Sequence, residues 1–121
     1  MLILIAGPYR SGTGNDPKLI QANMDRLEAM AVPIFRKGHI PLIGEWVANP
    51  IMKLAGSKEP GDAIFQEVQY PVAHGLLPKC DAVLRIPGAS NGADQDVAIA
   101  RELGLRIYYD LAEIPEAISD T

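Results

Sequence analysis

The stretch that most constrains the fold of this chain is residues 80–105, with the sequence CDAVLRIPGASNGADQDVAIARELGL. Its first part, Asp81–Ile86, is short and mostly apolar, as expected for a strand, and the turn signal Pro87-Gly88 follows it. Ser90 or Asn91 can then cap a helix that continues to a glycine near the end of the stretch. The stretch therefore predicts a strand, a short loop and a helix in succession.

The rest of the chain repeats this alternation of strand and helix. Leu2–Ala6 is a continuous run of apolar residues, typical of a strand buried on both faces of a parallel sheet. Further strands are expected at 39–43 and 106–109, and helices at 17–37, 45–54, 61–77 and 110–119. The alternation predicts an α/β fold with a parallel sheet, right-handed crossovers and helices on both faces. In the expected strand order 2-1-3-4, the strand at 2–6 lies beside the strand at 82–86.

One acidic residue, Asp96, lies on the apolar face of the expected helix. The small or apolar residues that share this face at helical spacing are Ala93, Ile99, Ala100 and Leu103. Asp94 lies on another side of the helix and can face water. A carboxylate that faces the sheet must be paired or line a cleft, because burying it alone costs too much free energy. The alternatives for Asp96 are therefore a helix cap, a buried ion pair with an arginine, or a place in a functional cleft.

A glycine-rich loop, residues 7–14, follows the first strand. It offers backbone N–H groups, hydroxyl groups and the Arg10 guanidinium, which together suit a phosphate or another oxygen-rich ligand. It has neither the GxGxxG fingerprint of dinucleotide-binding enzymes nor the P-loop of nucleoside triphosphatases, which disfavours both classes. Since ligands bind at the carboxyl ends of parallel strands where the strand order reverses, we expect this loop and the loop before Asp96 to form one cleft. The alternative is that the glycine loop is only a connector.

Composition disfavours several classes of function. The chain has 121 residues, 48% of them hydrophobic, which fits one domain over 1–121 with a single core. Its net charge of -4 argues against a nucleic-acid polymer as partner. A single cysteine cannot form an internal disulfide, which favours the cytoplasm. No segment has the apolar run that a membrane helix needs, and no cluster at metal-ligand spacing is present, so neither a membrane nor a metal is expected.

Taken together, these motifs resemble those of the nucleoside 2-deoxyribosyltransferase-like superfamily. The resemblance rests on IAGP at the end of the first strand, on Lys37-Gly38-His39, and on CDAV followed by PGASNGADQD and ARELGLRI. It covers both ends of the chain and is most specific over 80–107, whereas 44–75 match loosely. It implies a flavodoxin-like, Rossmann-like three-layer sandwich. It also implies cleavage or transfer at the N-glycosidic bond of a nucleoside or nucleoside 5'-monophosphate, with no cofactor.

The resemblance assigns roles to particular residues. The nucleophilic carboxylate of the family falls on Asp96, and Tyr9 falls where the family has an aromatic or hydroxyl side chain near the nucleophile. Residues 10–12 resemble a phosphate-binding loop, and Ser90 supplies a further phosphate-binding hydroxyl. Apart from the resemblance, the side chains of Glu45 and Trp46 can close the base side of the pocket by hydrogen bonding and stacking, the alternative being that Trp46 packs in the core. The expected substrate-binding residues are Gly7, Arg10, Ser11, Gly12, Pro87, Gly88, Ser90, Gly92 and Trp46.

Two residues differ from the pattern of the family. Asp96 is one methylene shorter than the glutamate found there, and the second acid of the family falls near Ala73, where this chain has none. His74 and Glu67 are the candidates for the missing proton donor. The alternative function is a non-catalytic nucleotide-binding or sensing domain of the same fold.

Self-association is also expected. The region between 44 and 77 carries more apolar side chains than a domain of this size readily covers. These side chains are Ile51, Met52, Leu54, Ile64, Phe65 and Val68. The resemblance implies subunits that complete one another's pockets, so we expect a homodimer or homotetramer whose partner is otherwise a small-molecule nucleoside or nucleotide.

Overall fold

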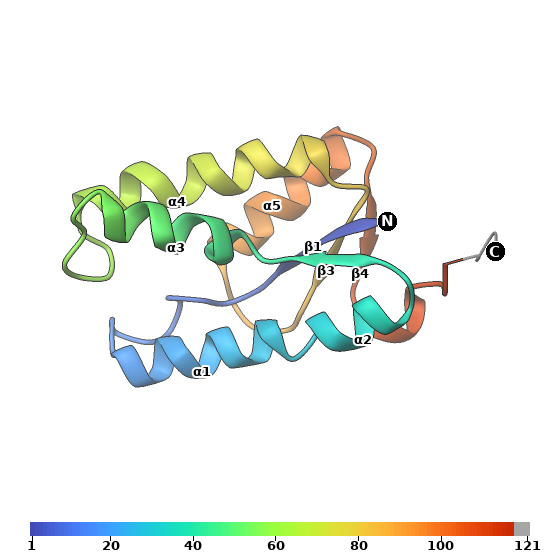
Figure 1. The fold of residues 1–121 in the computed structure, drawn as a ribbon, viewed down its shortest axis with the longest axis horizontal. Coiled ribbons are helices and arrows are strands. Elements are labelled where there is room, and N and C mark those ends of the chain that lie inside the picture. The colour runs from blue at the N-terminus through green and yellow to red at the C-terminus, as the bar shows by residue number, and fades with distance from the viewer. Residues whose placement is uncertain (118–121) are drawn as a thin grey trace.

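A computed structural model describes residues 1–117 of the chain, and within them four parallel strands form the central sheet. The strands are β1 (Leu2–Ala6), β2 (Ile40–Leu42), β3 (Ala82–Arg85) and β4 (Arg106–Tyr108), in the order β2-β1-β3-β4 (Figure 1). Leu4 of β1 aligns with Leu42 on one side and with Val83 on the other. The predicted parallel sheet, with the first and third strands as its adjacent central strands, is confirmed.

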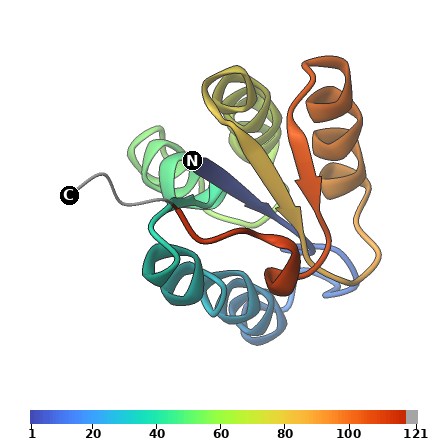
Figure 2. The ribbon, with the colours of Figure 1, turned by 90° about the vertical axis from the view of Figure 1, so that its right-hand side faces the viewer.

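Helices cover both faces of this sheet. They are α1 (Pro17–Glu28), α2 (Ala31–Arg36), α3 (Gly44–Leu54), α4 (Ala63–Leu76) and α5 (Asn91–Glu102), with single 3-10 turns at Leu77–Lys79 and Leu111–Glu113. Figure 2, which looks along the sheet, shows α1 and α2 on one face, α4 and α5 on the other, and α3 beside α4. The chain is therefore an α/β sandwich of three layers, consistent with a flavodoxin-like fold.

The helix expected over 17–37 is instead two helices, α1 and α2. Proline has no N–H to donate, and its ring collides with the carbonyl four residues earlier. Pro33 would place this collision at Ala29, and Ala29 is where α1 ends. The chain restarts as α2 two residues later, with Pro33 in the first turn, where its missing N–H costs no hydrogen bond.

The terminal helix expected over 110–119 is also not formed in its described part. Residues 111–113 make one 3-10 turn, capped by Asp110 and Glu113, and the backbone of Ile114 is extended. The extended conformation follows from Pro115, because a residue before proline is driven out of the helical region. Positions 118 and 119 of the predicted helix lie outside the described residues.

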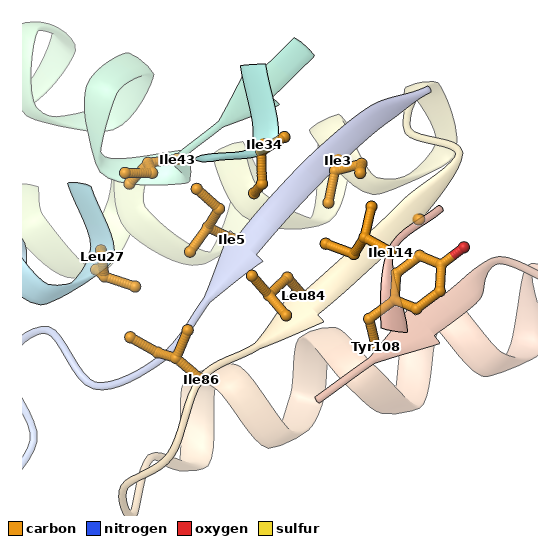
Figure 3. Close-up of a cluster of buried hydrophobic side chains, with 10 residues drawn as sticks. Ile3, Ile5, Leu27, Ile34, Ile43, Leu84, Ile86, Tyr108 and Ile114 are labelled. Carbon is orange, nitrogen blue, oxygen red and sulfur yellow. The ribbon is translucent and has the colours of Figure 1, made fainter. Parts of the chain in front are cut away.

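The core consists of one apolar cluster on each face of the sheet. Figure 3 shows the cluster on the α1 and α2 side, where Ile3 and Ile5 of β1 and Leu84 of β3 meet Leu27 and Ile34. The cluster on the other face contains Leu4, Ala6, Leu77, Cys80, Val83, Ala93 and Ala100. Because β1 and β3 contribute to both clusters, they are the buried, two-faced strands that their apolar runs predicted.

The middle region covers most of its apolar side chains by pairing α3 with α4. Met52 and Phe65 are buried in a third cluster with Ala48, and Ile64 and Val68 pack against it. Only Ile51, 43% exposed, and Leu54, 89% exposed, remain open from the set named above. The apolar surplus is thus smaller than the sequence predicted, and the homodimer or homotetramer stays a prediction. No helix in the described part of the chain is long and apolar enough to cross a membrane.

Two glycines let the loops after β1 and β3 approach each other. A Cβ atom at Gly7 would overlap the Ile86 side chain, with Cδ1 at 2.9 Å, and a Cβ atom at Gly88 would lie 2.6 Å from Pro8 Cγ. Gly88 also has a φ of 119°, a conformation that residues with a Cβ rarely adopt. These contacts hold the two loops together at one edge of the sheet.

Replacing Gly7 with alanine should destabilise the fold, because the new methyl group and buried Ile86 cannot both be accommodated without displacement. We expect the free energy of unfolding from urea titration to fall by about 1–3 kcal/mol. The matched control is Gly75→Ala in α4, where, beyond its chain neighbours and the backbone of its own helix, no atom of the described residues lies within 4 Å of the added Cβ. That variant should equal the wild type or gain about 0.5–1 kcal/mol. Equal stability of Gly7→Ala and Gly75→Ala would contradict the close packing of Gly7.

Candidate functional site

A cavity of about 400 Å³ opens at the carboxyl ends of the strands. Its walls come from the end of β1 and the loop after it, from the starts of α3 and α5, and from the middle of α4. This volume lies in the range typical of sites for small molecules. The cavity brings together Gly7, Tyr9, Arg10, Ser11, Ser90, Gly92 and Asp96 from the predicted set.

Four predicted residues lie outside the cavity lining. Gly12 forms an exposed turn of the loop, with a φ of 72°. Pro87 is exposed, and Gly88 packs against Pro8 behind the lining. Trp46 does not line the cavity, and its Nε1 donates a hydrogen bond to the Glu28 carboxylate at 2.9 Å. Their predicted contacts with a substrate are therefore not part of the cavity seen here.

The loop after β1 is held in shape by buried polar side chains. Asn23 of α1 donates from Nδ2 to the Tyr9 carbonyl at 2.7 Å, and Arg26 donates in turn to the Asn23 carbonyl oxygen. The hydroxyl of Thr13 donates to the Arg10 carbonyl at 2.6 Å. Both Thr13 and Asn23 are 5% exposed. These two residues position the loop, and sequence reasoning missed them because their partners are backbone atoms.

The guanidinium of Arg10 lies against the start of α4, next to the cavity. Its guanidinium carbon lies 4.9 Å from the centre of the Phe65 ring, a cation–π contact. The guanidinium also fills the space beside Gly61, where a Cβ atom would overlap it. Arg10 is thus a lining cation with a defined orientation, and within residues 1–117 it has no acidic partner.

Asp96 is a half-buried carboxylate on the cavity wall. It lies in the second turn of α5, whose N-cap is Ser90, with the Ser90 hydroxyl accepting from the Ala93 N–H at 3.1 Å. The ion pair on this helix joins Arg85 to Asp94 at 3.0 Å. Among the described residues, the Asp96 carboxylate has no hydrogen-bond or ion-pair partner, so the cap and the salt bridge considered from the sequence are made by Ser90 and Asp94 instead.

A second carboxylate, Glu45, lines the same cavity. Burial raises its pKa, opposed by a hydrogen bond from its own backbone N–H. Burial also raises the pKa of Asp96 to about 7; the charge of Glu45 raises it further, and the charge of Arg85 opposes both. For Tyr9, burial raises the pKa most, followed by a hydrogen bond from Asn49 that lowers it and the Glu45 charge that raises it.

The sequence placed Glu45 beside the base but did not identify it as an acid coupled to Asp96. The available signal was its position directly after β2, the strand that lies beside β1 in the expected order. Both carboxylates therefore sit at the carboxyl edge of the sheet, on either side of the loop that carries Tyr9.

Neither of the expected proton donors near Ala73, Glu67 and His74, lines the cavity. Ala73 itself lines the cavity, and a Cβ atom at Gly44 would lie 3.9 Å from the Ala73 Cβ. Glu67 is exposed and outside the lining. His74 is also outside it; its Nε2 is buried and has no hydrogen-bond partner among residues 1–117, and its ring centre lies 6.1 Å from that of Tyr70. The position next to Ala73 is occupied by the start of α3, which carries Glu45.

The cavity therefore combines two acids, a phenol and a cation. Over residues 1–117, no group of three or more histidine, cysteine or acidic side chains is placed to hold a metal ion. The Glu45 charge raises the pKa of Asp96, so ionising both carboxylates at once is opposed and the pair favours holding one proton. One proton donor and one ionised carboxylate can thus coexist here near neutral pH.

Asp96→Asn should stabilise the fold at alkaline pH. Between the ordinary pKa of 3.8 and about 7, the unfolded chain has lost the Asp96 proton while the folded chain keeps it, so stability falls as pH rises. Above pH 7 the full cost of the buried charge is present, at most roughly 4 kcal/mol. The variant should gain free energy of unfolding at pH 8, and the gain should vanish near pH 4, as measured by urea titration.

Asp94→Asn is the matched control, because it removes the same group from the same helix. Asp94 is exposed and paired with Arg85, so its neutralisation should lower stability slightly or leave it unchanged at pH 8. A gain equal to that of Asp96→Asn would attribute the effect to the net charge of the chain rather than to the buried carboxylate.

Comparison of the chain with family models, with curated proteins and with solved structures finds no match. The resemblance noted from the sequence motifs therefore stands on those motifs alone. The groups that line the cavity are a loop of fixed shape, the Arg10 side chain, and two carboxylates of which Glu45 raises the pKa of Asp96.

Proposed function

We propose that this chain cleaves the N-glycosidic bond of a nucleoside or nucleoside 5'-monophosphate, releasing the base to water or transferring the sugar to a second base. The observation that carries the proposal is the Asp96 carboxylate, half-buried and unpartnered within the described residues, on the wall of a cavity sized for a small molecule. Burial of an unpaired carboxylate is costly for folding, and such groups concentrate at functional sites. The motif resemblance of residues 5–8 and 80–107 supports the same chemistry.

In the proposed reaction, an Asp96 oxygen attacks the anomeric carbon of the sugar. The bond from this carbon to the base nitrogen breaks, and its electron pair leaves with the base, which must gain a proton. Water, or a second base, then attacks the same carbon and releases Asp96. Two displacements at one carbon give net retention of configuration.

The phosphate of a monophosphate would lie between the glycine loop and the start of α5. Arg10 and Ser11 line the cavity from the loop, and Ser90, Asn91 and Gly92 line it at the N-terminus of α5. Free N–H groups and the positive end of the dipole at a helix N-terminus favour an anion. The hydroxyl of Ser90 uses its oxygen to accept from Ala93, so its proton is available for a phosphate oxygen.

A second candidate function is binding without catalysis. The raised pKa of Asp96 supports it, because a carboxyl with a pKa of about 7 is largely protonated in slightly acidic solution and can then donate a hydrogen bond to a bound nucleotide. Such a domain would sense a nucleotide through the same cavity. Assays of catalysis and of binding separate the two functions.

Asp96→Asn should abolish base release while leaving ligand affinity within about threefold, because the amide keeps the shape of the carboxylate but is no nucleophile. The measurement is chromatographic detection of free base from a panel of ribo- and deoxyribonucleosides and their 5'-monophosphates. Asp94→Asn serves as control and should release base at the wild-type rate.

Two results would contradict the catalytic role of Asp96. Undiminished release by Asp96→Asn would remove this residue from the mechanism. If the wild type releases no base from any member of the panel but binds one tightly by calorimetry, the binding function replaces the catalytic one.

Arg10→Ala should weaken the binding of a nucleoside 5'-monophosphate by about 10- to 100-fold, as expected for loss of a charge-assisted phosphate contact. The parent nucleoside should change much less, because it has no phosphate. Calorimetric titration of both ligands measures the difference. Arg101→Ala is the control, since Arg101 contacts Tyr109 at 3.0 Å and does not line the cavity. Equal losses for nucleoside and monophosphate would contradict a phosphate role for Arg10.

A further inference from the structure

Glu45 occupies a position that neither the motif resemblance nor the proposed role of Asp96 accounts for. It is the first side chain of α3 that faces the cavity, directly after the turn that follows β2. We propose that Glu45 is the second catalytic carboxylate of this site, the group that protonates the departing base. This inference rests on the proposed N-glycosidic chemistry and names the residue that completes it.

The topology places the two carboxylates on opposite sides of the same loop. β2 and β3 flank β1, so the segments that follow them, carrying Glu45 and then Asp96, flank the loop that follows β1. Tyr9, Glu45 and Asp96 all line the cavity, so a ligand that fills it would meet both carboxylates. An acid that attacks the sugar and an acid that protonates the base must lie on different sides of the bond that breaks.

No other acidic side chain lines the cavity within the described part of the chain. The other titratable or charged groups that face the pair are Tyr9 and Arg10 from the loop, Tyr70 from α4, and Arg85 of β3, whose charge acts on Asp96. Arg85 is held by Asp94 and by the carbonyls of Ile86 and Gly88, so it does not neutralise either acid directly. The phenol oxygen of Tyr9 accepts a hydrogen bond from Asn49 Nδ2 at 3.2 Å, and burial raises the pKa of Tyr9, which makes it a weaker acid than a carboxyl group. Proton donation therefore falls to Glu45.

The charge that develops on the sugar decides which carboxylate holds the shared proton during reaction. In the free protein the raised pKa of Asp96 places a proton on the pair near neutrality. As the anomeric carbon gains positive charge, it stabilises the ionised form of the nearer carboxylate, Asp96, and the proton then resides on Glu45. The amide groups at the start of α3 favour the return of Glu45 to its ionised form after it has donated.

The two steps balance in atoms and charge. The Asp96 oxygen bonds to the anomeric carbon as the bond to the base nitrogen breaks, and the Glu45 proton moves to the base, leaving Glu45 ionised. Water then attacks the anomeric carbon, the ester bond to Asp96 breaks with its electron pair returning to the carboxylate, and Glu45 takes a proton from the water. Both side chains regain their starting states, and the products are the free base and the sugar.

The test compares two leaving groups in Glu45→Gln. The amide is isosteric but cannot donate an acidic proton, so release of an ordinary purine should fall by at least 100-fold. A purine nucleoside methylated at N7 already carries a positive charge on its base and departs without protonation. Glu45→Gln should therefore cleave the N7-methylated substrate within about fivefold of the wild-type rate, and this retained activity also shows that the variant is folded.

Glu67→Gln is the matched control, because Glu67 is an exposed acid outside the lining that the sequence had offered as a donor. It should behave as the wild type with both substrates. Equal losses of Glu45→Gln on both substrates would overturn the donor role and show that Glu45 acts on sugar binding or on the fold. Unchanged cleavage of the ordinary purine would exclude Glu45 from the reaction.

The pH dependence gives a second readout. With an ordinary purine nucleoside, the wild-type rate should be bell-shaped, falling as pH rises through about 7, where the pair loses its last proton, and falling again in acid, where both carboxylates are protonated and neither can act as nucleophile. With the N7-methylated substrate the alkaline fall should disappear. In Glu45→Gln the Asp96 pKa, followed by carboxyl NMR, should move down because the neighbouring charge is gone.

The failures of the two proposals are distinguishable. A wild-type protein that cleaves neither substrate overturns the proposed function and the role of Glu45 with it. If the wild type cleaves both substrates, Glu45→Gln cleaves them at the same rates, and the Asp96 pKa does not shift in this variant, then only the role of Glu45 is overturned. Loss of the ordinary substrate alone supports both.

Discussion

The structure depends on the burial of β1 and β3 between two apolar layers. Side chains of both strands enter the clusters on both faces of the sheet, so these strands cannot slip in register without exposing one of the layers. Their carboxyl ends therefore leave the sheet at fixed points. Gly7 and Gly88 then allow the two emerging loops to pack closely together, and this contact supports the lining of the cavity from behind.

The carboxylate of Asp96, which lies next to these apolar layers, destabilises the fold. Asp96 is half-buried and unpaired within residues 1–117, and it costs free energy at neutral pH that an asparagine would not. The ion pair with Arg85 is made instead by Asp94, two residues earlier on the same helix. The chain keeps Asp96 where its burial costs stability, and it pairs the exposed Asp94 with Arg85. This pattern is expected where an active site is maintained at the expense of stability.

The sheet and part of the site could be predicted because their signals are local. Apolar runs at 2–6 and 82–86 predicted the central strands, and the spacing on the last helix singled out Asp96. The sequence could not show that Glu45, and not Trp46, lines the cavity. Which of two neighbouring residues faces the cavity depends on how α3 is rotated about its axis where it packs against α4. Pro33 accounts for the break between α1 and α2, which the continuous apolar spacing of 17–37 does not show. Thr13 and Asn23 act on backbone atoms, which no side-chain motif reports.

The hydrogen bonds of Thr13 and Asn23 to the loop after β1 affect how a ligand would be received. Each ordered residue of a loop gives up conformational entropy, and a loop that orders only around its ligand subtracts that entropy from affinity. Here the carbonyls of Tyr9 and Arg10 are already anchored to α1 and to the turn, so the loss is incurred once, when the chain folds. A ligand would meet a wall that is already in place, and its rate of entry would be governed by diffusion into the opening rather than by rearrangement of the loop.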